Sequence, residues 1–292
     1  MKAAAFHYHD PRTREDLMGL LGRLDDLKLL AGGQSLMPMM NFRIVAPTHL
    51  VDLNRVDGLG GISRQGAEVR FGALTRQREV KASEIVANDL PILTEALDHV
   101  GHVQTRSRGT IGGSCCHLDP SAEIPAIAAL YDAIFEIGGP DGTREVGYAD
   151  WHLGMLTSAL DEREVLEGIR FKPWQPADAG HGWGFYEYAR RHGDFAIAGA
   201  GCLVDISDQG TIERIATVVM GVDAVPVRLR EAEAALVGAR PDRTAIAALV
   251  EAARSIDAMT DPQVSATYRR RLAGVVTERA VLAAFQRSGI TQ

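Results

Sequence analysis

The apolar residues of this chain recur at two spacings, and together they predict a mixture of helices and strands. Leu17, Leu20, Leu21 and Leu24 form a helical stripe, and Thr13 is placed to cap the first turn of that helix. Short apolar or alternating runs predict strands at Leu27–Ala31, His49–Leu53, Glu68–Leu74, Ala133–Ile137, Arg144–Val146, Val165–Phe171, Gly184–Ala189, Ala196–Ile206 and Ile212–Gly221. We expect further helices after Thr75, from Pro91, and at Pro120–Leu130, Arg228–Val237, Asp242–Ile256 and Tyr268–Phe285.

The order of these elements predicts an α+β fold with two domains. Residues 1–56 would form a small α/β unit and residues 57–175 a larger one, and the two together make the first domain. The segment Lys172–Gly182 holds two prolines and two glycines, which is typical of a linker, so the boundary is expected at residue 175. Residues 176–292 would then form a three-stranded antiparallel sheet followed by a helical bundle.

Composition narrows the possible functions. The 292 residues carry a formal net charge of −7, which disfavours nucleic acids and anionic membranes as partners. We find no apolar run long enough for a membrane span and no export signal at the start, so we expect a cytoplasmic protein. Cys115, Cys116 and Cys202 are one thiol short of a common iron–sulfur cluster, and the histidines show no metal-ligand spacing. We therefore expect no metal site on this chain.

Two glycine-rich segments are the strongest candidates for chemistry. The first reads Ala31-Gly32-Gly33-Gln34-Ser35-Leu36 and directly follows a predicted strand, and the second reads Thr110-Ile111-Gly112-Gly113-Ser114. Paired glycines let a backbone approach a bulky anion and turn its N–H groups toward it. The two segments could therefore clamp one pyrophosphate, with Asp119 and Glu123 accepting hydrogen bonds from a ribose or an adenine. An ordinary turn would have the same local sequence, and neither segment matches the G-x-G-x-x-G of a Rossmann dinucleotide site.

Taken in order, several motifs resemble the FAD-binding medium subunits of aerobic carbon monoxide dehydrogenase and related hydroxylases of the xanthine dehydrogenase family. The resemblance covers nearly the whole chain. It is carried by Ala31–Met40, by Thr110–Ser114 with Asp119–Glu123, by Arg191-His192-Gly193-Asp194-Phe195-Ala196, by Gly221-Val222 with Pro226-Val227-Arg228, and by Tyr268-Arg269 with Leu272-Ala273. Two positions depart from the family pattern, since Ser114 stands where Asn is common and Leu118 where Ala is common.

The resemblance implies a flavin-binding fold of the vanillyl-alcohol-oxidase type. The two glycine segments would hold the FAD pyrophosphate, Glu123 would contact FAD, and Tyr186 and Phe195 would approach the flavin ring from the C-terminal domain. Some relatives of this fold bind flavin covalently through histidine, which Gln34 cannot do, so the FAD is expected to be noncovalent.

The resemblance further implies a heterotrimeric complex, assembled as a dimer of heterotrimers. A large partner subunit would bind molybdopterin, and a small partner would carry two [2Fe–2S] clusters. This chain would take electrons from those clusters and pass them to NAD, a quinone, oxygen or another acceptor. A self-sufficient flavin oxidase of the same fold and a non-enzymatic nucleotide-binding module remain open as alternatives.

Two other groups of residues have simpler interpretations. Cys115 and Cys116 are expected to pack as small apolar residues, and the run Arg269-Arg270-Arg271 is expected on a solvent face or at a subunit contact. No residue of the chain is expected to act as a catalytic acid or base.

Overall fold

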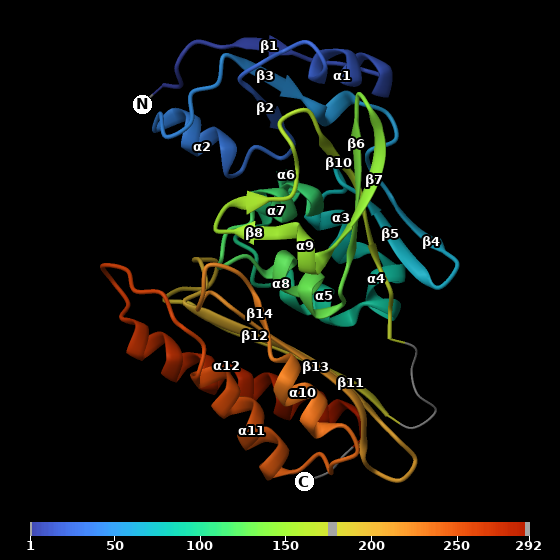
Figure 1. The fold of residues 1–292 in the computed structure, drawn as a ribbon, viewed down its shortest axis with the longest axis vertical. Helices are drawn as coiled ribbons and strands as arrows, with labels where there is room; N and C mark the ends of the chain where they lie inside the picture. Colours follow the sequence, from blue (N-terminus) through green and yellow to red (C-terminus); the bar gives the residue numbers. More distant parts are fainter. Residues whose placement is uncertain (1, 175–179, 290–292) are drawn as a thin grey trace.

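The computed structural model describes residues 2–174 and 180–289. Figure 1 shows three units along the long axis of the molecule, each built on its own main sheet. We call residues 2–56 the first unit, residues 57–174 the second unit and residues 180–289 the third unit. The boundary predicted at residue 175 lies outside the described residues.

The first unit is a three-stranded parallel sheet with strand order β1-β3-β2. Its elements are β1 (His7–His9), α1 (Arg14–Leu21), β2 (Leu27–Leu30), α2 (Leu36–Asn41), β3 (His49–Asp52) and the short 3₁₀ helix η1 (Leu53–Arg55). As predicted, the Thr13 hydroxyl caps α1 by accepting a hydrogen bond from the Asp16 amide at 3.1 Å. Arg14 of α1 reaches Glu167 in the second unit at 2.6 Å, so an ion pair also joins the two units.

The second unit is a five-stranded sheet with helices gathered on one face (Figure 1). The sheet order is β4 (Ile62–Gln65), β5 (Glu68–Gly72), β10 (Val165–Phe171), β6 (Ile134–Gly139) and β7 (Gly142–Gly147). The remaining elements are α3 (Gln77–Ala82), α4 (Glu84–Asp89), α5 (Pro91–Ala96), α6 (Val103–Arg108), α7 (Ile111–His117), α8 (Glu123–Leu130), α9 (Tyr148–Trp151), β8 (His152–Gly154) and β9 (Thr157–Ser158). All eight residues of α8 are buried, which makes it the central helix of the molecule.

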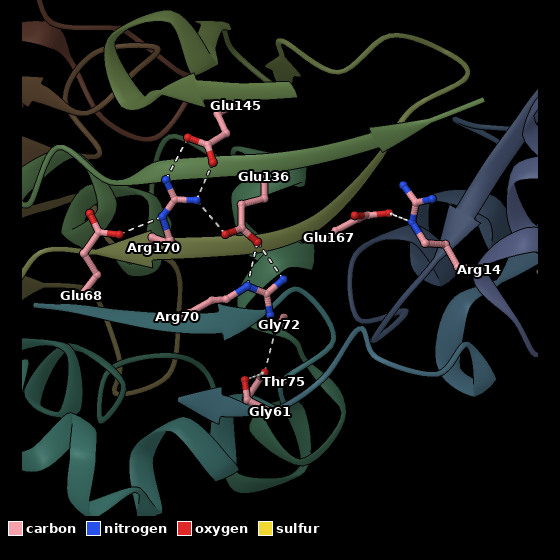
Figure 2. A network of polar contacts seen from close by, with 10 residues as sticks. All are labelled: Arg14, Gly61, Glu68, Arg70, Gly72, Thr75, Glu136, Glu145, Glu167 and Arg170. Carbon is pink, nitrogen blue, oxygen red and sulfur yellow. Dashed lines mark hydrogen bonds and ion pairs between the residues drawn. The ribbon is translucent and has the colours of Figure 1, made fainter. Parts of the chain in front are cut away.

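The other face of the five-stranded sheet is held together by charge rather than by apolar packing. Figure 2 shows Arg170 bonded to Glu68, Glu136 and Glu145 at 2.7–2.8 Å, while Arg70 bonds Glu136 at 2.7 Å. These five side chains come from four adjacent strands and are spaced two residues apart along β5, so they share one face. The network ties the strands together on the face that has no helices.

The third unit is an antiparallel sheet covered on one side by helices. The sheet runs β11 (His181–Tyr188), β12 (Ala198–Ile206), β13 (Ile212–Met220) and β14 (Val227–Arg228), and α10 (Arg230–Leu236), α11 (Arg243–Arg254) and α12 (Ala266–Arg287) follow. The three predicted strands are present, and β14 adds a short fourth strand at the edge. A Cβ on Gly184 would lie 2.1 Å from the carbonyl oxygen of Ala280, so glycine is what lets α12 pack so closely on β11.

The side chains of β11 alternate between two faces, one of which packs against α12. Gly184 and Tyr186 face α12, while Trp183, Phe185 and Glu187 alternate onto the opposite face, toward the second unit. Phe185 belongs to the same apolar core as α8, and Tyr186 packs on the core around α12. The third unit therefore contributes the odd-numbered residues of β11 to its contact with the second unit.

Arg269 corrects one of our predictions. It is only 7% exposed, and its guanidinium donates to the carbonyl oxygens of Ile197 and Gly221 and to the carboxylate of Asp261. The arginine run therefore does not lie wholly at the surface, since its first member is a buried tie between α12 and the sheet. No helix among residues 2–174 and 180–289 is long and apolar enough to cross a membrane.

Candidate functional site

The two glycine segments lie against each other, although they are far apart in the sequence. A Cβ on Gly32 would lie 2.4 Å from the carbonyl oxygen of Arg108 and 2.8 Å from the Cα of Gly109. A Cβ on Gly113 would lie 3.7 Å from the Cβ of Ala31. The close approach of these backbones requires glycine at position 32.

The first segment, Ala31–Leu36, presents free backbone donors. Among the described residues, the amides of Gly32, Gly33, Gln34 and Ser35 donate no hydrogen bond to another protein atom. Gly33 has φ +70°, a left-handed conformation, and Leu36 begins α2 directly afterwards. Consecutive free amides at the start of a helix form a site for a phosphate oxygen.

The polar side chains of the first segment, Gln34 and Ser35, make few hydrogen bonds to the rest of the protein. The Gln34 amide group donates to the Gly32 carbonyl at 3.2 Å and so braces the turn from within. Ser35 occupies the N-cap position of α2 but its hydroxyl makes no capping hydrogen bond there.

The second segment, Thr110–Ser114, is the first turn of helix α7 rather than a loop. Its amides are already used: Ile111 donates to Thr75 O at 3.0 Å, Gly112 to Ala73 O at 2.9 Å and Gly113 to the Thr110 hydroxyl at 3.0 Å. A Cβ on Gly112 would lie 2.6 Å from the carbonyl oxygen of Ala73. The glycines of this segment are therefore required by packing, and only the first segment offers exposed amides to an anion.

A clasp that the sequence did not predict holds the two segments together. Arg76 donates to the carbonyl oxygen of Arg108 and to the side-chain oxygen of Asn54. Asn54 in turn donates to the Ala31 carbonyl at 2.9 Å. Burial lowers the pKa of Arg76, but an arginine keeps its charge, so the clasp also places a cation beside both segments. No motif marks Arg76 or Asn54, because the segments that they join lie far apart in the sequence.

The segment Asp119–Glu123 connects the second unit to the third. The Asp119 carboxylate accepts a hydrogen bond from the Ser121 amide at 2.9 Å, and the Ser121 hydroxyl donates to the Ala196 carbonyl at 2.8 Å. The Gly221 amide donates to the Pro120 carbonyl at 2.8 Å. This segment is thus fixed from both sides, immediately after α7.

Glu123 is the first residue of α8 and is almost fully buried. Burial raises its pKa to about 8, and the nearby carboxyl of Glu187 adds to the rise. A helix N-terminus favours a carboxylate, but here that effect is outweighed by the loss of solvent. Burial likewise raises the pKa of Glu187, to about 7.

Phe195 and Tyr186, the two aromatic residues expected near the cofactor, lie in different surroundings. Phe195 is 75% exposed and directly precedes Ala196, whose carbonyl holds Ser121, so it lies near the Asp119–Glu123 segment. Tyr186 faces α12, where the Arg279 guanidinium lies 4.5 Å from the centre of its ring. The structure therefore does not bring Tyr186 to the glycine segments, and Glu187 is its neighbour on the face that does approach the second unit.

Comparison with known proteins agrees with this geometry. Residues 4–174 match the family model described as the FAD binding domain in molybdopterin dehydrogenase, and residues 183–284 match the CO dehydrogenase flavoprotein C-terminal domain. The chain belongs to the family of FAD-binding subunits of molybdenum hydroxylases. These are oxidoreductase subunits, and the cofactor of this chain is FAD.

Individual relatives match over their whole length. The chain is 35% identical to subunit alpha of the 6-hydroxypseudooxynicotine dehydrogenase complex of Paenarthrobacter nicotinovorans, covering 100% of this chain and 98% of the relative. It is 37% identical to the carbon monoxide dehydrogenase medium chain of Hydrogenophaga pseudoflava, covering 97% and 98%. A solved structure of carbon monoxide dehydrogenase from Hydrogenophaga pseudoflava superposes with a TM-score of 0.93 at 37% identity, covering 98% of this chain and 99% of that one.

The residues present fit a dinucleotide cofactor. Four consecutive amides that have no partner among the described residues supply donors for a pyrophosphate, and the Arg76 cation supplies positive charge. Of the paired thiols, Cys115 is fully buried and its carbonyl accepts the Trp151 indole N–H at 2.9 Å, so Cys115 has the packing role expected of it.

Proposed function

We propose that this chain is the electron-transfer subunit of a molybdenum hydroxylase complex, with FAD held noncovalently across the two glycine segments. The observation that carries the proposal is the contact between Gly32 and the Arg108–Gly109 backbone, beside four amides that have no partner in the described part of the chain. That contact brings the first and second units together, and it supports one anion-binding surface formed by both.

In this proposal the protein residues bind and orient the cofactor. The amides of Gly32, Gly33, Gln34 and Ser35 donate to the pyrophosphate, and the Ser114 hydroxyl approaches it from the second segment. Glu123 contacts the cofactor from α8, and Phe195 covers it from the third unit. A bound flavin can accept electrons one at a time and release them singly or as a pair.

The electrons are proposed to come from a partner subunit. The three cysteines of the chain are one short of the four thiolates that hold a common iron–sulfur cluster. We propose a small partner with [2Fe–2S] clusters, a large partner with molybdopterin, and a dimer of such heterotrimers. Cys115, Cys116 and Cys202 are free thiols, which fits the reducing conditions of the cytoplasm.

The substrate of the complex would be chosen by the large partner. The relatives named above belong to complexes named for 6-hydroxypseudooxynicotine and for carbon monoxide, yet they are 35% and 37% identical to this chain. Similar flavin subunits therefore accompany very different substrates, and the same holds for this chain under our proposal.

Reconstitution of the isolated chain with FAD tests the cofactor part of the proposal. We expect the chain to bind FAD stoichiometrically, to release all of it into the supernatant on acid precipitation, and to oxidise no organic substrate by itself. Flavin that stays with the precipitate would contradict noncovalent binding. Steady turnover of an organic substrate by the isolated chain would instead support a self-sufficient oxidase.

A further inference from the structure

A chain of hydrogen bonds leads from strand β1 to the first segment. The Tyr8 hydroxyl on β1 donates to the carboxylate of Asp52 at 2.6 Å, and Asp52 also accepts from the backbone amide of Asn54 at 2.9 Å and from its side-chain amide group. The same side-chain amide group donates to the Ala31 carbonyl at 2.9 Å. Asp52 therefore reaches the first residue of the segment through one intervening side chain, that of Asn54.

The sheet topology explains why Asp52 lies at this place. Strands β2 and β3 are parallel neighbours, and Leu30 of β2 pairs with Asp52 of β3. Both strands therefore end at the same edge of the sheet, where Ala31 follows β2 directly. Ligands of parallel sheets bind beyond the carboxyl ends of the strands, so Asp52 places a negative charge at the edge where an anion is expected. By charge alone, this carboxylate would repel a phosphate.

The side-chain amide of Asn54 is held in one orientation by its two neighbours. Burial acts to raise the pKa of Asp52, but hydrogen bonds from Tyr8 and Asn54 outweigh burial and hold that pKa below its ordinary value, so the group is a carboxylate that only accepts. The Arg76 guanidinium, which donates to the side-chain oxygen of Asn54, can only donate. Turning the amide over would set its NH₂ group against Arg76 and its oxygen against Asp52. The nitrogen of Asn54 is therefore kept on the side of Ala31.

The hydrogen bond to the Ala31 carbonyl determines where the next backbone amide points. The peptide bond between Ala31 and Gly32 is trans, so its C=O and N–H groups lie in one plane and point in opposite directions. Holding the Ala31 oxygen toward Asn54 turns the N–H of Gly32 away from Asn54. Gly32 carries the first of the four consecutive amides that have no partner in the described part of the chain. A carbonyl that accepts a hydrogen bond also polarises its peptide group, which makes this N–H a better donor.

We propose that Asp52 is a positioning residue of the FAD site, because it fixes the orientation of the Asn54 amide group, which in turn aims the N–H of Gly32 at the pyrophosphate. This role deepens the proposed function and rests on it for the identity of the anion. A carboxylate that acted by its charge alone would weaken FAD binding, so its removal would strengthen binding. Removal of a positioning residue weakens binding instead, and the sign of the change separates the two roles.

The first test is the affinity of the full chain for FAD, measured by titration calorimetry. Asp52→Ala should raise Kd about 2- to 12-fold, the effect of one lost hydrogen bond, while Asp52→Asn keeps an acceptor oxygen and should stay within about twofold of the wild type. Asp10→Ala is the matched control, because Asp10 follows β1 at the same edge but pairs with Arg12 and Arg55. Tighter binding by Asp52→Ala, or an equal rise of Kd in Asp10→Ala, would overturn the proposal.

A double-mutant cycle shows whether Asp52 acts through Asn54. In the Asn54→Ala background the connection to Ala31 is already lost, so Asp52→Ala should change Kd by less than about twofold there. The same factor in both backgrounds would mean that the two side chains act independently, and the proposal would be wrong. Circular dichroism checks that each variant is folded. Asp52→Ser keeps a side-chain cap for η1 and replaces Asp52→Ala if that variant does not fold.

The second test uses the full chain without cofactor and separates the positioning role from the proposed function. With labelled glycine, the nitrogen-15 resonance of Gly32 reports the hydrogen bond to the Ala31 carbonyl. We expect Asp52→Ala to shift this resonance in the same direction as Asn54→Ala and to leave that of Gly60, which is exposed in the second unit, unchanged. If Gly32 shifts but the chain binds no FAD, the positioning role holds and the proposed function fails. If FAD binds but Asp52→Ala leaves the Gly32 resonance in place, the positioning role fails and the proposed function stands.

Discussion

Replacing Gly32 by alanine tests the contact on which the proposed site depends. The added Cβ would lie 2.4 Å from the carbonyl oxygen of Arg108, whereas Cβ atoms in folded proteins stay 3.0 Å or more from such atoms. The two segments must therefore separate by about 0.6 Å, because no rotamer change can relieve a clash with backbone. Overpacking of this kind costs about 1–3 kcal/mol.

The predicted result is a weaker FAD site. If the whole cost falls on the cofactor-binding geometry, Kd for FAD rises roughly 5- to 150-fold. Titration calorimetry with FAD measures this, and circular dichroism checks that the variant is folded. Gly60→Ala is the control, since a Cβ there meets nothing within 4 Å and Gly60 has no positive φ. A folded Gly32→Ala protein that binds FAD as tightly as Gly60→Ala would refute the reasoning.

Three further changes test other parts of the structure. Glu123 and Glu187 have raised pKa values in the folded state, so the folded protein binds more protons than the unfolded chain, and stability should fall as pH rises. Urea unfolding of the cofactor-free chain should show a loss of about 1 kcal/mol between pH 7 and 8, and Glu187→Gln should reduce it. Arg76→Met removes the clasp between the glycine segments, so Kd for FAD should rise about tenfold or more in the same calorimetric titration. Arg269→Met leaves two carbonyls and Asp261 without their donor, so the free energy of unfolding should fall by about 3 kcal/mol.

Each of these predictions has a result that would contradict it. The half-buried His99, His117 and His152 have lowered pKa values and oppose the pH effect only below about pH 6.5, so stability that stays flat from pH 7 to 8 would count against the raised glutamate values. Wild-type affinity in Arg76→Met would mean that packing alone holds the segments together. Arg270→Met is the matched control for position 269, since Arg270 lies next to it on α12. An equal fall in the free energy of unfolding in both variants would show that the hydrogen bonds of Arg269 are not the cause.

Much of the fold was predictable because its signals are local. The helix capped by Thr13 and the strand Val165–Phe171 appear where the periodicity placed them, and β12 and β13 differ from their predictions by one or two residues. In each of these elements, buried apolar residues recur at the spacing of the secondary structure.

The elements that were missed have no such pattern. None of the residues of α6 is buried, and β1 is a three-residue strand with no buried residue. Helix α7 contains two glycines, each of which costs about 1 kcal/mol relative to alanine in a helix, so its sequence predicts a loop. Its formation depends on contacts with Ala73 and Thr75, which lie far away in the sequence.

In the candidate site, too, some features were predictable from local sequence and others were not. The glycine segments are visible as motifs, and the structure brings them together. The clasp of Arg76 and Asn54 and the burial of Glu123 depend on the arrangement of distant segments in space. Tyr186 lies on the α12 side of β11, because a one-residue step along a strand reverses the face on which a side chain lies, and its approach to the flavin ring stays a prediction.

The most direct test of the central claim is the cofactor content of the complex that this chain forms in its native host. The tagged chain would be purified under non-denaturing conditions, and FAD, iron and molybdenum would be quantified in the same gel-filtration peak. The account predicts one FAD and one molybdenum for each copy of this chain, with the iron of two [2Fe–2S] clusters. A chain that elutes alone with bound FAD, with neither iron nor molybdenum in its peak, would contradict it.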